Sequence, residues 1–398
     1  MSAARLLCVL CVFVVNAHAE EWRFTTDRDG EVGLTIHASV PGSNWGKAGA
    51  EAVVLTLNVD GRYSQDVTLF MGATAHDYTV LLGPLRRGAH TLTYRRNERY
   101  SASGAQSFQA TFNAEVLDDP AIARAPVVYL RPDTAGRFSD VPLFAWYEEL
   151  DEPSGRVLQF TVAFSNEDGG TNTPALFARW GRTLDIEHLI RFTPNGPIFQ
   201  GRNHKETPFR GRKLGQHPIL YDVTENNNFD ARGRSPLRVI LWPVRADLSR
   251  HSRELLADQN PWLYRIMSEE LAREGKNAIV GDPRDYLYVE AKITAAYAAA
   301  SFVAGGATSD RGNPKMRIDR DGWIRTAILL PEKKLPGLTF RCDAPAKPKD
   351  QPPVCGIEAV TKAFFLDADY RPGPNLLEWK GPPARLAPGE SRALGGSR

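Results

Sequence analysis

The chain has 398 residues, of which 42% are hydrophobic and 24% charged, with 33 Gly and 28 Pro. This is an ordinary globular composition, and it excludes a wholly disordered, collagen-like or coiled-coil protein. The 49 Lys and Arg residues nearly cancel the 47 Asp and Glu residues. A polycationic surface for broad nucleic-acid binding is therefore excluded, and no nucleic acid is expected as a partner.

The first 19 residues have the pattern of a cleaved secretion signal. Arg5 supplies the positive charge, residues 6–15 form an apolar run, and Ala17-His18-Ala19 is a small-x-small cleavage site. The apolar run is shorter than the roughly 20 residues that span a bilayer. We expect a secreted or periplasmic mature chain that starts at Glu20 and contains no transmembrane segment.

The next segment, residues 20–118, alternates short apolar runs with turn signals. Residues 53–59 lead into Asp60-Gly61, which is a strong hairpin signal, and further strand patterns cover 67–71, 78–82, 90–94 and 107–116. This spacing predicts a small immunoglobulin-like or jelly-roll sandwich. Residues 119–126 are acidic and proline-containing, so they predict a linker.

A larger β-rich domain is predicted over residues 127–380. Its clearest strand patterns cover 158–164, 176–180, 184–192, 219–223, 237–244, 286–294 and 323–330. One helix is marked at 261–274, where Asn260 can cap it, Pro261 suits its first position and Gly275 can end it. Residues 381–398 are rich in Pro, Gly, Ser and Arg and predict a disordered tail. The expected fold is thus mainly β, with two sandwiches in sequence.

Two cysteines remain after the signal is removed. Cys342 and Cys355 flank a proline-rich segment, and in an exported protein such a close pair most simply forms a structural disulfide.

The candidate catalytic carboxylates lie in the strand pattern 184–192. Side chains alternate along a strand, so Asp185 and Glu187 share one face about 7 Å apart. Two carboxylates this close form an acid–base pair if water is partly excluded. An ordinary charged surface strand explains the pattern equally well.

Two histidines complete the predicted catalytic set. His204 and His217 follow the strand within 30 residues, and imidazole carries protons near neutral pH and binds metals. With Asp185 or Glu187 they form a candidate zinc site or a general base with its partner. The oxygen-rich loop 165–171 is a candidate calcium site, or only a tight turn. The metal's identity stays open.

Two groups of residues are candidates for substrate binding. Arg202, Asn203 and Asn226 offer a cation and amides in loops, while Tyr286, Tyr288 and Glu290 alternate on one face of a strand. Tyrosine rings stack on sugars and carboxylates bind hydroxyls. Residues 200–250 hold ten Lys or Arg against five Asp or Glu, which favours an anionic ligand such as an acidic polysaccharide.

One stretch resembles a known family. Asp185-x-Glu187-His188, His204 and then His217-Pro218-x-x-Tyr221 are similar to motifs of the vacuolar protein sorting-associated protein sixty-two family. Ile186 stands where that family has tryptophan. The resemblance covers about a tenth of the chain and implies a shared polar site, with no activity attached.

These patterns predict an exported protein that acts on a polysaccharide or other cell-envelope glycan, as a hydrolase or lyase. The alternatives are a non-catalytic glycan- or surface-binding protein and a structural envelope protein. Nucleotide cofactors are not expected, because no P-loop or strand-embedded GxGxxG is present.

Overall fold

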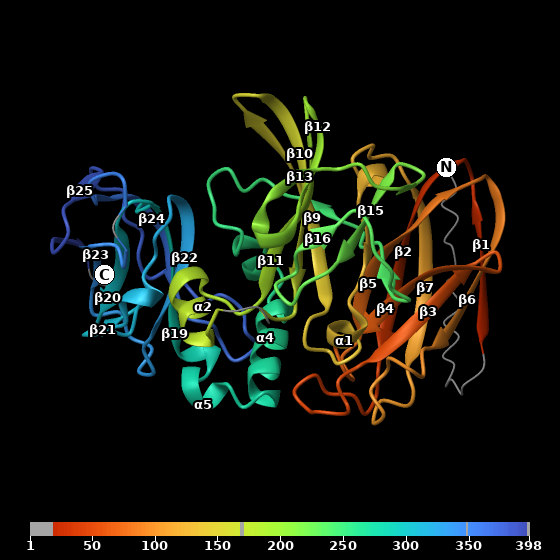
Figure 1. Ribbon diagram of the computed structural model, residues 1–398. Coiled ribbons are helices and arrows are strands. Elements are labelled where there is room, and N and C mark those ends of the chain that lie inside the picture. The colour runs from red at the N-terminus through yellow and green to blue at the C-terminus, as the bar shows by residue number, and fades with distance from the viewer. Residues whose placement is uncertain (1–18, 168–170, 348, 396–398) are drawn as a thin grey trace, which may run out of the picture. The chain divides into compact units, whose positions relative to one another are not determined.

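The computed structural model describes residues 19–167, 171–347 and 349–395. The predicted signal peptide therefore lies outside the described residues except for Ala19. The fold is mainly β, as predicted (Figure 1). In the part of the chain described, no helix has the length and apolarity needed to cross a bilayer.

The chain divides into two compact units. The first comprises residues 1–161 and 188–244, and the second residues 162–187 and 245–398. The chain passes from one unit to the other inside three strands, so neither unit is a single stretch of sequence. The predicted linker 119–126 does not separate them, because it lies within the first unit, where Ile122–Arg124 form the 3-10 turn η1.

The first unit begins with the predicted sandwich. One sheet has the order β1-β6-β3-β4 and the other β5-β2-β7, and Tyr94 and Phe112 join them with ring centroids 4.5 Å apart. The hairpin at Asp60-Gly61 is confirmed, since both residues have positive φ, as a tight turn of this kind requires. The strands are β1 Glu20–Thr26, β2 Gly30–Ser39, β3 Val53–Val59, β4 Arg62–Leu69, β5 His76–Leu85, β6 Gly88–Arg96 and β7 Gln109–Leu117.

Two further sheets follow in chain order. A six-stranded sheet has the order β13-β12-β11-β10-β9-β18, and another has the order β14-β15-β8-β17 with β16 beside β15. The predicted strand 237–244 is reduced to two short segments separated by residues 240–243. The elements are β8 Val127–Tyr129, α1 Pro132–Ala135, β9 Pro142–Glu152, β10 Gly155–Phe164, β11 Asp185–Thr193, β12 Gly196–Gln200, η2 Arg202–His204, β13 Glu206–Pro208, β14 Lys213–Leu214, β15 His217–Asp222, β16 Phe229–Asp230, β17 Arg238–Val239 and β18 Val244–Arg245.

The second unit contains another sandwich. Its sheets, β22-β19-β24-β25 and β21-β20-β23-β26, enclose an apolar core in which Leu287, Phe302, Phe340 and Val360 are fully buried. The strands and 3-10 turns are η3 Pro283–Asp285, β19 Tyr286–Thr294, β20 Ala299–Ala304, β21 Ala307–Thr308, η4 Pro314–Met316, β22 Gly322–Leu329, β23 Leu338–Asp343, β24 Cys355–Phe364, β25 Ala384–Leu386 and β26 Ser391–Gly395.

Helices cover one side of the β19-containing sheet (Figure 1). Tyr264 packs on Tyr288 at 5.6 Å and Phe177 stacks on Tyr286 at 4.4 Å between ring centroids. The helices are α2 Thr173–Trp180, α3 Leu255–Gln259, α4 Trp262–Arg273 and α5 Asn277–Val280.

Helix α4 is the predicted helix 261–274. Gly275 ends it with a φ of +69°. The side chain of Asn260 does not cap it, because its amide instead donates to the carbonyl of Leu256 in α3.

Two predictions about secondary structure are wrong. Residues 176–180 belong to helix α2, because Asn172 accepts from the amide of Ala175 at its start and Gly181 ends it with a left-handed backbone. The predicted disordered tail instead contributes β25 to one sheet and β26 to the other, where each pairs with an inner strand.

The disulfide Cys342–Cys355 is confirmed, and it joins the two sheets of the second sandwich. Cys342 lies on β23 and Cys355 on β24, and both are fully buried. The bond therefore closes a short loop and also ties the two sheets to each other.

We predict that Cys342→Ser with Cys355→Ser lowers the free energy of unfolding by about 3 kcal/mol, the stabilisation expected for closing a loop of this length. Urea unfolding at pH 7 measures the difference. Reductant should destabilise the wild type and leave the double variant unchanged; equal stability of the two proteins under oxidising conditions would contradict the prediction.

Candidate functional site

The four predicted catalytic residues are divided between the two units. Asp185 and Glu187 lie on the part of β11 that belongs to the second unit, and they are buried, with 2% and 9% of their surface exposed. His204 and His217 belong to the first unit, where they occupy separate surroundings. The pairing of these two imidazoles in one site is therefore not observed.

His217 is a buried structural residue. It is fully buried at the start of β15, and its Nδ1 donates to the carbonyl of Ala125 at 2.7 Å. Its Nε2 lies 3.0 Å from a carboxylate oxygen of Glu31, which is also buried. With both ring nitrogens engaged and no exposed surface, His217 has no nitrogen for a substrate, which corrects its predicted role as base or ligand.

His204 lies in a cluster of amides, here called the amide–imidazole cluster (Gln200, Asn203, His204, Asn226 and Asn228). Its Nδ1 is 3.1 Å from the side-chain amide of Gln200, and its Nε2 is 2.6 Å from that of Asn226. A neutral imidazole has one donor and one acceptor, so one amide must present its oxygen and the other its nitrogen. The ring itself is exposed.

Two loops form this cluster. The backbone amide of Asn203 donates to Oδ1 of Asn228 at 2.8 Å, and the side chain of Asn228 donates to the carbonyl of Asn226 at 2.9 Å. Asn203, His204 and Asn227 all have positive φ, which is uncommon for residues other than glycine. The structure thus brings the predicted residues Asn203, His204 and Asn226 together in a fixed conformation.

Basic side chains surround the same loops. Seven Lys and Arg residues between 202 and 234 are exposed, and none of them forms an ion pair with any residue that the structure describes. We call them the basic loop surface: Arg202, Lys205, Arg210, Arg212, Lys213, Arg232 and Arg234.

Strand β15 holds the two halves of the basic loop surface together. Lys213 pairs with Pro218 on one side of β15, and Asp230 pairs with Tyr221 further along it. The segments also touch directly, since a Cβ placed on Gly211 would lie 3.0 Å from that of Ala231. Arg210 and Arg212 are therefore close to Arg232.

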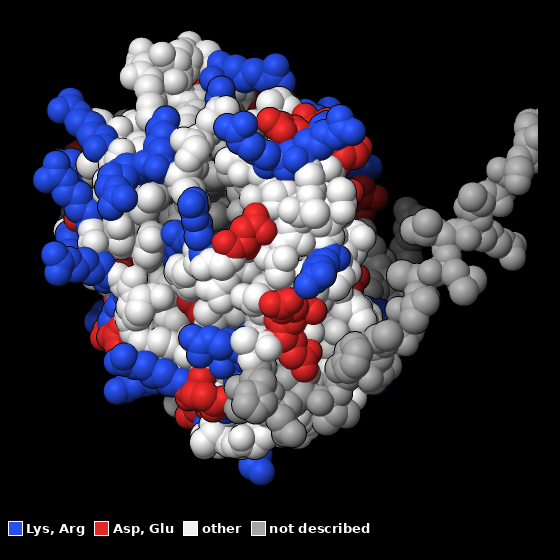
Figure 2. Space-filling model, turned by 90° about the vertical axis from the view of Figure 1, so that its right-hand side faces the viewer, with Lys and Arg blue, Asp and Glu red and all other residues white. Residues whose placement is uncertain are grey.

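The surface charge is unevenly distributed although the net charge is small. On the face drawn in Figure 2, Lys and Arg side chains are most numerous along the top and left edges, where some Asp and Glu side chains lie among them. A local excess of one charge favours ligands of the opposite charge more than the net charge alone suggests.

The second unit contains a buried charged network centred on Arg325. This guanidinium is fully buried and reaches both oxygens of Asp258, at 3.0 and 2.8 Å, and Glu290 at 3.2 Å. Glu290 faces Arg325 across the β19–β22 pair and Lys362 across the β19–β24 pair. Asp258 also accepts from the Tyr264 hydroxyl.

Glu290 is ionised in this setting. Burial by itself raises the pKa of this carboxyl group, but the charge of Arg325 and hydrogen bonds from His251 and Thr361 outweigh it and lower the pKa to about 2. The carboxylate also accepts two hydrogen bonds from Ser252, one from its amide and one from its hydroxyl.

His251 connects this network to solvent. Its Nδ1 is 3.0 Å from Oε1 of Glu290, and 40% of its side chain is exposed. An ionised carboxylate only accepts, so Nδ1 carries the hydrogen and a neutral ring keeps its Nε2 lone pair as an acceptor. The ring lies against Trp323, with centroids 6.3 Å apart and planes inclined by 27°. Sequence reasoning identified Glu290 but missed His251, for which no motif or spacing gives a signal.

The predicted tyrosine face is buried. Tyr286 and Tyr288 are 1% and 0% exposed, and their hydroxyls donate to the carbonyls of Val280 and Pro283 beneath the helices. This corrects their predicted role in stacking on sugars. The alternating pattern was right, but helices α2 and α4 cover the side that we expected to face solvent.

The candidate metal sites gain no support. Within the described ranges no group of three or more His, Cys, Asp or Glu is arranged to hold an ion. The candidate calcium loop 165–171 lies partly outside those ranges, and its first residues, Ser165 and Asn166, are buried.

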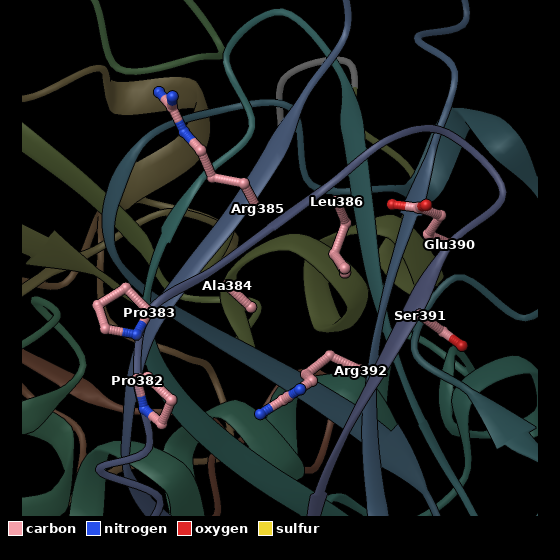
Figure 3. Close-up of a pocket in the computed structure, with 8 residues that line it drawn as sticks. All are labelled: Pro382, Pro383, Ala384, Arg385, Leu386, Glu390, Ser391 and Arg392. Carbon is pink, nitrogen blue, oxygen red and sulfur yellow. The ribbon is translucent and has the colours of Figure 1, made fainter.

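A shallow pocket of about 570 Å³ lies between β25 and β26 (Figure 3). Two exposed arginines, Arg385 and Arg392, line it together with Pro382, Pro383 and Glu390. Sequence reasoning missed this feature because it predicted a disordered tail.

The comparisons with known proteins do not assign this chain to a family. No family model matches the chain, and no curated protein matches it, so the resemblance at residues 185–221 stays a prediction. Among solved structures, a ruminal GH26 endo-β-1,4-mannanase is 15% identical over 27% of this chain and 20% of its own, with a TM-score of 0.20. A family 35 carbohydrate binding module from an environmental isolate is 13% identical over 26% of this chain and 73% of its own, with a TM-score of 0.19.

A family two carbohydrate esterase from Clostridium thermocellum, in complex with cellohexaose, is 21% identical over 30% of this chain and 32% of its own, with a TM-score of 0.17. The chain thus spans about a fifth of the mannanase and about a third of the esterase. With such TM-scores, these likenesses establish neither a shared fold nor a shared function.

We predict that Glu290→Gln lowers the free energy of unfolding by about 3 kcal/mol at pH 7, from the fall in the Glu290 pKa from 4.5 to about 2. A lowered pKa stabilises the fold above the unfolded-state pKa, and this stabilisation is lost as the pH falls through the folded-state pKa. The stabilities of wild type and variant should therefore converge between pH 4.5 and 2. Urea unfolding of both proteins at several pH values between 4.5 and 2 measures this convergence.

The exposed Glu358 offers a matched control for this carboxylate. Its ion pair with Lys292 is 42–44% exposed, so Glu358→Gln should change stability by less than about 1 kcal/mol. A pH-independent difference between wild type and Glu290→Gln would contradict the assignment of an ionised Glu290.

Proposed function

We propose that this chain is an exported protein that binds an acidic polysaccharide of the cell envelope through the basic loop surface. The observation that carries the proposal is the set of seven exposed cations that have no acidic partner among the described residues. Surface cations are commonly offset by nearby carboxylates, as the exposed Arg156 is here by Glu149. Cations left without such partners attract anions.

The neighbouring amide–imidazole cluster favours a glycan over other polyanions. Its side-chain amides donate and accept hydrogen bonds, which matches the hydroxyl groups of a sugar. A polysaccharide with carboxylate or sulfate groups presents both chemistries along one strand. The near-zero net charge also argues against a general nucleic-acid binder.

Binding is better supported than catalysis at the predicted residues. His217 is buried with both nitrogens engaged, and both nitrogens of His204 contact amides. The acid–base set predicted from the sequence therefore lacks a free proton carrier in the first unit. This favours the alternative of a non-catalytic glycan-binding protein.

The test is a variant in which Arg210, Arg212 and Arg232 are all replaced by Ser. We expect its Kd for polygalacturonate to rise roughly 10- to 100-fold, since three lost contacts of about 0.5–1 kcal/mol each give this factor. Binding of the wild type should weaken as salt is raised. Isothermal titration calorimetry against polygalacturonate, alginate and a neutral mannan measures both effects.

A control of equal charge uses the exposed Arg62, Arg87 and Arg95 of the same unit. Replacing these three by Ser removes the same charge and should leave the affinity within about twofold. Equal weakening by both triple variants, no binding of any acidic polysaccharide, or tighter binding of duplex DNA than of these glycans would overturn the proposal.

A further inference from the structure

The strongest feature outside the basic loop surface is the aromatic pair His251–Trp323 in the second unit. Trp323 lies on β22, next to Lys292 in the strand register, and His251 comes from the loop before α3. Both rings are partly exposed and lie nearly parallel. Together they form a stacked, partly exposed aromatic pair beside the β19–β22 strand pair.

Hydrogen bonds fix this surface in place. The indole Nε1 of Trp323 donates to the carbonyl of Ser249 at 3.1 Å, so the loop is fastened to β22. The same loop is fastened to β19, because His251 and Ser252 both bond to Glu290. Within the loop, His251 donates its amide to the carbonyl of Leu248. A surface organised in advance loses little conformational entropy when a ligand binds.

Polar groups beside the rings suit sugar hydroxyls. The Nε2 of His251 lies on the far side of the ring from Glu290 and has no hydrogen bond to a residue that the structure describes. Lys292 and Glu358 form an exposed ion pair at 2.7 Å. Indole stacks on the apolar face of a pyranose, and such neighbours hydrogen-bond to its hydroxyls.

The charges of the ion-paired groups here cancel. Arg325, Lys362 and Lys292 are balanced by Asp258, Glu290 and Glu358, to which they are paired. Hydrogen bonds from Ser249 lower the pKa of Asp247, and the exposed Arg250 next to His251 lies close enough to lower it further. A site without excess charge favours an uncharged ligand.

We propose that His251 and Trp323 form a binding subsite for a neutral pyranose residue, with Glu290 as the positioning residue that holds His251. The inference rests on the proposed function only for the class of ligand, a glycan. It assigns the second unit a neutral-sugar contact that is separate from the acidic-glycan contact of the first unit.

The test uses the full mature chain and a panel of neutral oligosaccharides: cellohexaose, mannohexaose, xylohexaose and maltohexaose. We expect at least one of them to bind, as measured by calorimetry and by quenching of tryptophan fluorescence. Trp323→Ala should weaken that binding at least tenfold, and Trp323→Phe, which keeps an aromatic ring, should retain part of it. Circular dichroism of each variant checks that it folds.

Two further variants separate this role from a merely structural one. His251→Phe keeps a ring against Trp323 but removes both Nε2 and the Nδ1 that bonds to Glu290, so it should lower affinity several-fold without abolishing binding. Tyr297→Ala removes an aromatic side chain that is 42% exposed elsewhere in the same unit and should have no effect. Failure of every neutral oligosaccharide to bind, or unchanged binding by folded Trp323→Ala, would overturn the subsite.

The two proposals fail in distinguishable ways. The triple variant at Arg210, Arg212 and Arg232 should keep its affinity for the neutral oligosaccharide, and Trp323→Ala should keep its affinity for polygalacturonate. Loss of both kinds of binding in either variant would show a single site and contradict the subsite as a separate contact.

Discussion

The second unit depends on the neutralisation of a fully buried guanidinium. Arg325 lies between the sheet and helices α3 and α4, where burial without partners would cost far more than a typical protein's stability margin. Asp258 at the end of α3 and Glu290 on β19 supply the compensating charges. This ion pair fixes the position of the helical layer over the sheet, because Asp258 on α3 must lie next to Arg325 on β22.

The same network of buried charges also orients side chains at the surface of the unit. Because Arg325 keeps Glu290 ionised, the carboxylate can hold His251, Ser252 and Thr361 at once. His251 is in turn held beside Trp323 at the edge of the helical layer. A structural ion pair therefore orients a partly exposed aromatic pair, so stability and the proposed sugar contact arise from the same residues.

Sequence patterns predicted much of the fold for clear physical reasons. Two-residue alternation identified β19 with its exact bounds, and the Asp60-Gly61 turn identified the first hairpin. Helix α2 was mistaken for a strand because a five-residue, mostly apolar segment is too short to show a distinguishing period, while its stronger signals, Asn172 and Gly181, lie at its ends. The C-terminal strands were missed because backbone pairing to β23 and β24 orders them despite a polar composition.

The candidate site residues also divide into those that the sequence predicted and those that only the structure revealed. Asn203, His204 and Asn226 were recognised from residue type, and the structure brings them together through two facing loops. Nothing in the spacing of His217 could show that Glu31 and Ala125 would enclose it, since both lie at least 92 residues away in sequence. His251 was missed for the same reason, because its partner Glu290 is 39 residues distant.

The sequence by itself determined three properties of this protein. The mainly β class follows from local patterns, and the concentration of cations between residues 200 and 250 follows from composition. The disulfide partners follow because the expected mature chain contains only two thiols. Only the tertiary structure decided which faces are covered. Tyr286 and Tyr288 lie under helices while His251 and Trp323 remain partly exposed, and burial of this kind depends on contacts between segments far apart in the chain, which no local pattern records.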